Sequence, residues 1–107
     1  MKKILIIEDN KDLQEIYRHS FEKDGYTVVS KDNGQDGYDA ITTELPDVIL
    51  LDLMMPGVNG FDFLQKLNSV EGITIPVIVC SNISDIEMIN KAIQGGAAAV
   101  LLKVDYV

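Results

Sequence analysis

Acidic, hydroxyl and basic side chains stand directly after short apolar runs in this sequence. These side chains belong to Glu8, Asp9, Asp52, Ser81 and Lys103. A carboxylate at the end of a buried apolar segment is costly unless its charge has a partner or lies outside the apolar layer. The three carboxylates, the hydroxyl and the ammonium are therefore candidates for one site, if the fold brings them together.

The chemistry of such a set follows from its functional groups. Carboxylates close to one another repel and raise one another's pKa, and a hard divalent cation removes this conflict. Carboxylate oxygens suit Mg²⁺, which often shares its coordination shell with a phosphate. An aspartate can act as a nucleophile toward a phosphoryl group, while a lysine ammonium neutralises charge on that group. The residue types thus predict Mg²⁺-dependent phosphoryl chemistry at Asp52, assisted by Ser81 and Lys103.

Apolar runs alternate with segments of helical periodicity along the chain. Strands are expected near residues 3–7, 26–30, 48–51, 75–80 and 97–102. Helices are expected at residues 11–24, 35–44, 61–70 and 84–94. Strict alternation predicts an α/β fold, a three-layer doubly wound parallel sheet with helices on both faces. Because the carboxyl ends of parallel strands share one edge of the sheet, the five polar side chains should converge there.

The first predicted helix has an apolar and a polar face. The apolar face carries Leu13, Ile16, Tyr17, Ser20 and Phe21. The polar face carries Lys11, Asp12, Gln14, Glu15 and Arg18. Asn10 is the expected N-cap and Gly25 the expected residue just beyond the helix. We predict that the apolar face lies on the sheet and that His19 lies at the surface.

Composition narrows the classes of function. The 107 residues fit one domain, and their formal net charge of −8 argues against a surface for nucleic acid or anionic membranes. The single cysteine, Cys80, excludes an internal disulfide and suits a reducing compartment. No apolar stretch is long enough to span a membrane. These features predict a cytoplasmic protein with a buried, structural thiol.

Taken in this order, the site positions resemble the receiver domain of two-component response regulators. The resemblance is carried by Glu8-Asp9, the stretch Asp52-Leu53-Met54-Met55-Pro56-Gly57-Val58-Asn59-Gly60, Ser81 and Lys103, and it covers essentially the whole chain. It implies a single receiver domain over residues 1–107. It also implies a flavodoxin-like sheet of five strands in the order 2-1-3-4-5.

The resemblance also implies roles for individual residues. Asp52 would accept a phosphoryl group from a phosphohistidine of a sensor kinase or histidine phosphotransfer protein. The ligands of Mg²⁺ would be Glu8, Asp9, Asp52 and the backbone carbonyl of Met54. Ser81 and Lys103 would contact the phosphoryl group, and the rearrangement would alter a partner-binding surface. The chain would be a switch that slowly loses its own phosphoryl group, not a turnover enzyme.

Three departures from the family pattern keep alternatives open. Val100 stands where the family usually has an aromatic switch residue, Val104 where it usually has a proline, and the chain ends at Val107, before the usual fifth helix. We expect either a truncated domain or a chain that covers open apolar surface by forming a homodimer or swapping a segment. A phosphorylation-independent interaction module is the alternative function.

Two further functions are disfavoured. A phosphohydrolase with an aspartate nucleophile typically needs a second acid two residues later, and this position holds Met54. Flavin binding is disfavoured because the segment after the first strand is acidic and not built to cradle phosphate.

Overall fold

The computed structural model describes residues 2–52, 60–68, 75–81, 90–91 and 93–102. Its strands are β1 (Lys3–Ile7), β2 (Thr27–Lys31), β3 (Val48–Asp52), β4 (Val77–Ser81) and β5 (Ala99–Leu102). They form one parallel sheet in the order β2-β1-β3-β4-β5, which confirms the predicted α/β fold and strand order. The named helices are α1 (Lys11–Lys23), α2 (Gly34–Glu44) and α3 (Gly60–Asn68).

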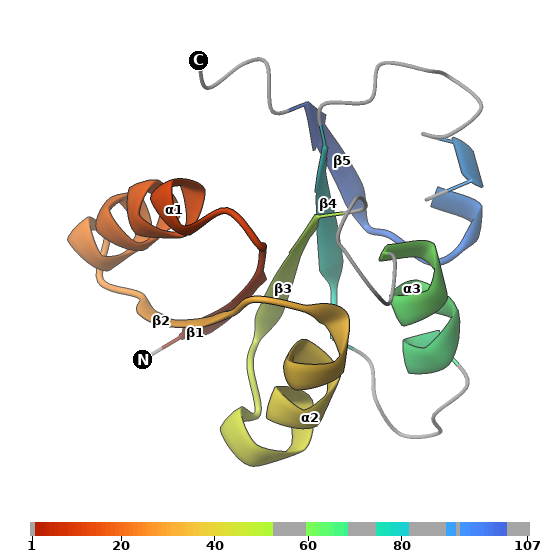
Figure 1. Cartoon of the computed structure of the whole chain (residues 1–107), viewed down its shortest axis with the longest axis horizontal. Coiled ribbons are helices and arrows are strands. Elements are labelled where there is room, and N and C mark those ends of the chain that lie inside the picture. Colours follow the sequence, from red (N-terminus) through yellow and green to blue (C-terminus); the bar gives the residue numbers. More distant parts are fainter. Residues whose placement is uncertain (1, 53–59, 69–74, 82–89, 92, 103–107) are drawn as a thin grey trace.

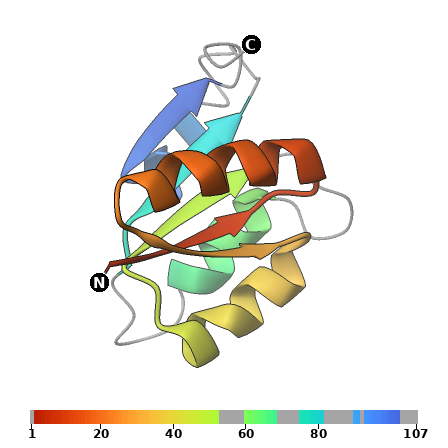
Figure 2. The ribbon, with the colours of Figure 1, turned by 90° about the vertical axis from the view of Figure 1, so that its left-hand side faces the viewer.

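The helices lie on both faces of the sheet. α1 covers one face, and α2 and α3 lie together on the other (Figure 1). Viewed from the side of α1, this helix crosses in front of the strands (Figure 2). Residues 90–91 and 93–94 are also helical, while the rest of the helix predicted from residue 84 lies outside the described residues. Within the described part of the chain, no helix combines the length and apolarity needed to cross a bilayer.

Local signals explain where two of the helices begin and end. α1 follows the predicted N-cap, because the side chain of Asn10 accepts hydrogen bonds from the backbone of Asp12 and Leu13. The chain leaves α1 through Gly25, whose φ of +94° is a conformation that favours glycine. Asn33 caps α2 in the same way, accepting a 2.9 Å hydrogen bond from the backbone of Asp36.

Each sheet face has its own apolar core. The core beneath α2 and α3 includes Leu5, Ile7, Ile49, Leu51, Phe63, Leu64 and Val79. The core beneath α1 includes Ile4, Ile6, Tyr17, Val28, Leu50 and Cys80. The strands of the sheet centre therefore bury both of their faces, as expected for continuous apolar runs in a parallel sheet.

The predicted inner face of α1 is partly wrong. Ile16 is 53% exposed, whereas Gln14, assigned to the polar face, is only 5% exposed. The helix is rotated so that Gln14 and Tyr17 face the sheet, and the side-chain amide of Gln14 finds hydrogen-bond partners at the ends of β1 and β2. Hydrogen bonds to these partners offset the cost of burying this amide, and apolar periodicity cannot reveal them.

We predict that Gly37→Ala destabilises the fold. A Cβ atom at this position of α2 would lie 2.5 Å from Cδ1 and 2.6 Å from Cγ1 of Ile7, which is fully buried. Alanine favours a helix, but overpacking here should lower the free energy of unfolding by about 1–2 kcal/mol, measured by urea denaturation. Ile7→Ala removes both of these atoms, so the double variant should lose less than the sum of the single losses. Additive losses would contradict this contact.

Candidate functional site

Three carboxylates meet at the carboxyl edge of the sheet. Oxygen atoms of Glu8, Asp9 and Asp52 all lie within 4.8 Å of one another. We call these three residues the acidic cluster. Glu8 and Asp9 follow β1, and Asp52 is the last residue of β3, the strand beside it. The convergence predicted for these carboxylates is therefore confirmed.

The members of the acidic cluster differ in exposure. Glu8 is 2% exposed and Asp52 4% exposed, while Asp9 is exposed. Two buried carboxylates beside a third repel one another and are expensive to desolvate. A hard cation with a preference for oxygen ligands would offset both costs, so the donor set fits Mg²⁺. The exposed Asp9 leaves one side of the cluster open to solvent.

Hydrogen bonds hold Glu8 through its backbone and its side chain. Its amide donates to the carbonyl of Lys31 at 3.0 Å, where β2 ends beside β1. Its Oε2 accepts a 3.2 Å hydrogen bond from the backbone amide of Asn10, the N-cap of α1. The end of β2 and the N-cap of α1 thus both hold this member of the acidic cluster in place.

Gln14 makes the third connection to Glu8. Its Nε2 donates to the backbone carbonyl of Glu8 and, at 2.8 Å, to Oδ1 of Asp32. Sequence reasoning missed this residue because a glutamine between charged neighbours on a helix usually faces solvent. One signal in the sequence could have revealed Gln14. It stands four residues after the N-cap Asn10, so both residues lie on the same side of α1, next to the segment that follows β1.

Asp32 follows β2, and the pKa of its carboxyl group is lowered. The hydrogen bond from Lys11, with Nζ and Oδ1 2.6 Å apart, lowers the pKa of Asp32, and the bond from Gln14 lowers it further. Both partners are on the first turns of α1. The pair of Asp32 and Lys11 therefore ties the end of β2 to the start of this helix.

The other predicted site residues are placed only in part. Ser81 ends β4 and pairs in register with Leu102, so its backbone lies at the same edge as Asp52, while its side chain is not described. Lys103 and Met54 lie outside the described residues. Their predicted contacts with a phosphoryl group or a cation stay predictions.

Cys80 is buried, as predicted for a structural thiol. It is 2% exposed and stands opposite Asp52 in the register of β3 and β4. Its Sγ lies 3.0 Å from the hydroxyl of Tyr17, so a hydrogen bond joins α1 to β4 beneath the sheet edge. This contact anchors α1 near the acidic cluster.

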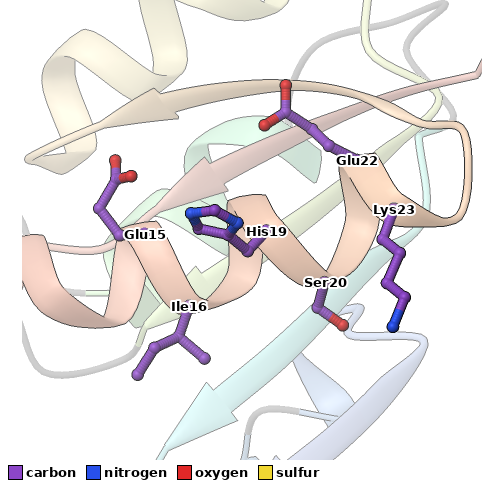
Figure 3. A pocket seen from close by; sticks show the side chains of 6 residues that line it. All are labelled: Glu15, Ile16, His19, Ser20, Glu22 and Lys23. Carbon is purple, nitrogen blue, oxygen red and sulfur yellow. The ribbon is translucent and has the colours of Figure 1, made fainter.

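An open pocket lies along α1, away from this edge. It is lined by Glu15, Ile16, His19, Ser20, Glu22 and Lys23. Figure 3 shows Ile16 and Ser20 on the side of the helix toward β4, and Glu15 and Glu22 on the opposite side. His19 is exposed there, as predicted, and belongs to no described metal cluster. The pocket contains no member of the acidic cluster.

Comparison with protein families gives one clear assignment. The model of the response regulator receiver domain matches residues 4–105. Sporulation initiation phosphotransferase F of Bacillus subtilis is 31% identical over 96 residues, which are 90% of this chain and 77% of that protein. Protein PilH of Pseudomonas aeruginosa is 40% identical over 82 residues, which are 74% of this chain and 66% of that protein.

Longer relatives and solved structures agree with this match. Transcriptional regulatory protein CusR of Escherichia coli is 35% identical over 94% of this chain, which spans only 44% of that protein. The receiver domain of the Francisella response regulator 1452 superposes with a TM-score of 0.90 at 28% identity, over 97% of this chain and 85% of that one. The chain thus resembles both receiver-sized proteins and the receiver part of longer regulators.

We predict that Asp9→Asn stabilises the protein without metal and abolishes its response to Mg²⁺. Removing one of three neighbouring charges should raise the free energy of unfolding by about 1 kcal/mol in chelator-treated buffer. Excess Mg²⁺ should stabilise the native chain, by about 2.7 kcal/mol at 100 times the Kd, but should stabilise the variant little. Urea denaturation measures both effects. Asp39→Asn, an exposed change on α2, should keep the full response; equal responses in all three proteins would contradict the site.

We predict that the carboxyl of Asp32 titrates below the 3.8 typical of an aspartate. Because its pKa is lowered on folding, Asp32 contributes stability above the unfolded pKa, and this contribution is lost as the pH falls through the folded pKa. Lys11→Met should raise the midpoint toward the ordinary value, as followed by NMR of the carboxyl carbon. Lys23→Met, at the far end of α1, should leave it unchanged. An unmoved midpoint in Lys11→Met would show that the pair is not formed in solution.

Proposed function

Because the chain belongs to the family of response regulator receiver domains, we propose that it is a signalling switch operated by phosphorylation of Asp52. The observation that carries the proposal is the acidic cluster, whose oxygens lie within 4.8 Å of one another at the carboxyl edge of the sheet. Asp52 is its member on the central strand β3 and the proposed phosphoacceptor. The donor is a phosphohistidine of a sensor histidine kinase or of a histidine phosphotransfer protein.

The transfer itself is a nucleophilic displacement at phosphorus. A carboxylate oxygen of Asp52 attacks the phosphorus atom, a P–O bond forms, and the P–N bond to the donor imidazole breaks. The electron pair of the broken bond stays on the imidazole nitrogen, which then takes a proton from solvent. The product is an aspartyl phosphate, which water later hydrolyses back to the carboxylate. The chain thus accepts and loses its own phosphoryl group and does not turn over a substrate.

The acidic cluster would hold Mg²⁺ through Glu8, Asp9, Asp52 and the backbone carbonyl of Met54. When bound, the cation supplies positive charge that offsets the charge of the phosphoryl group in transit. The residues of this chain orient the nucleophile. Burial of Asp52 and its position at the end of a paired strand restrict the carboxylate to a narrow range of orientations.

Lys103 and Ser81 are the proposed contacts of the transferred group. Lys103 directly follows β5, whose last residue, Leu102, pairs with Ser81 of β4. An ammonium and a hydroxyl carried on these neighbouring strand ends could both donate to phosphoryl oxygens. Their movement toward the phosphoryl group would alter a partner-binding surface at residues 90–102.

One observation favours the second candidate, a phosphorylation-independent interaction module. Val100, in the position of the usual aromatic switch residue, is partly buried and packs against the core beneath α2 and α3. A β-branched side chain held in a core has few rotamers to exchange. The extent of the domain, residues 1–107, its self-association and its location in the cytoplasm stay predictions.

We predict that beryllofluoride with Mg²⁺ shifts backbone amide resonances around Asp52 and at residues 90–102 of the native chain. Acetyl phosphate with Mg²⁺ should add 80 Da to the intact mass, because one phosphoryl group replaces a proton. Asp52→Asn, which lacks the nucleophile, should show neither response, while Asp39→Asn should show both.

The outcomes separate the two candidate functions. Shifts confined to the acidic cluster, with residues 90–102 unmoved, would favour the phosphorylation-independent module. An unchanged spectrum and mass in the native chain would contradict phosphorylation at Asp52.

A further inference from the structure

Gln14 is a buried polar side chain whose place is not explained by packing. It is 5% exposed on a helix whose neighbouring residues Lys11, Asp12 and Glu15 are exposed. Burying an uncharged amide costs free energy that only satisfied hydrogen bonds recover. The bonds of Nε2 lead to Glu8 and to Asp32, which lie at the ends of two adjacent strands. This amide therefore joins β1 and β2 at the edge that carries the acidic cluster.

The hydrogen bond from Gln14 is one of three that hold Glu8 in place. The backbone amide of Glu8 donates to Lys31, its carboxylate accepts from Asn10, and its carbonyl accepts from Gln14. The carbonyl belongs to the peptide unit that leads into Asp9, the next member of the acidic cluster. Losing the bond from Gln14 would free this peptide unit to rotate and would change the relative placement of both carboxylates.

Asp32 accepts the other hydrogen bond of this amide. Its Oδ1 accepts from both Gln14 and Lys11, so the carboxylate is held by α1 while Lys11 offsets its charge. A neutral amide can bridge a carbonyl and a carboxylate without adding charge beside the acidic cluster. A glutamate at this position would add repulsion to both neighbours, and an apolar side chain would leave the carbonyl of Glu8 without this donor.

We propose that Gln14 is a positioning residue that sets the geometry of the acidic cluster for Mg²⁺. The inference rests on the proposed binding of Mg²⁺ by this cluster. Mg²⁺ demands near-ideal octahedral geometry, whereas Ca²⁺ tolerates varied ligand numbers and angles. A residue that holds two carboxylates in place therefore matters more for Mg²⁺ than for Ca²⁺. This difference between cations distinguishes positioning from a general contribution to stability.

The test compares Gln14→Met with the native chain. Methionine keeps the length, burial and helix propensity of glutamine but donates no hydrogen bond. Gln35→Met is the matched control, because the amide of Gln35 donates to Asp39 on the exposed face of α2. NMR titrations with Mg²⁺ and with Ca²⁺, monitored at the amides of residues 8–13, give Kd values, and urea denaturation in chelator gives stability.

We expect the Kd for Mg²⁺ to rise by about 10-fold in Gln14→Met. The Kd for Ca²⁺ should rise clearly less, so that the ratio of the two constants shifts against Mg²⁺. Gln35→Met should keep both constants. Unchanged constants in Gln14→Met, or equal losses for the two cations, would overturn the positioning role. A native chain that does not bind Mg²⁺ would instead refute the proposed function on which the inference rests.

A measurement on the native chain covers the case in which Gln14→Met does not fold. The side-chain amide resonances of Gln14 should shift with Mg²⁺ along the same saturation curve as the backbone of Glu8, and those of Gln35 should not. Resonances of Gln14 that stay in place up to saturation would overturn the inference.

Discussion

The parallel register of β1 and β3 is the constraint on which the candidate site depends. Ile7 pairs with Leu51, so the residues that follow them emerge side by side at one edge of the sheet. Continuous apolar packing on both faces holds this register, because sliding either strand would displace buried side chains. The carboxylates that come next are brought together by the fold, whatever their mutual repulsion.

This dependence explains how much the sequence alone could predict. The apolar runs, their alternation with helical segments and the acids after them were sufficient for the α/β fold and for the meeting of Glu8, Asp9 and Asp52. Both features follow from periodicity and from the topology of parallel sheets, whereas the strand order was implied only by the resemblance to receiver domains. Once a strand is predicted correctly, the position of a carboxylate at its end is therefore predicted as well.

The errors concern contacts that periodicity does not encode. Ile16 was expected inside and Gln14 outside, yet hydrogen bonds from Gln14 to the ends of β1 and β2 rotate α1 the other way. A few satisfied polar bonds can outweigh the burial of one apolar side chain, since each contributes on the order of 1 kcal/mol and leaving either partner unpaired costs more. The capping role of Asn33 was missed for a similar reason, because an Asn-Gly pair signals a turn and a helix start equally well.

The electrostatics of the sheet edge link the fold to the proposed switch. α1 begins directly after Glu8 and Asp9, so the positive end of its dipole lies beside the acidic cluster, and the amide of Asn10 donates to Glu8. A helix start offsets only about 0.3–1 kcal/mol for each nearby charge, less than the cost of keeping Glu8 and Asp52 buried as anions. The remaining cost is what a bound cation would relieve. A phosphoryl group added at Asp52, as proposed, would change that balance again. The packed register that forces the charges together would then make this edge respond both to a bound cation and to phosphorylation.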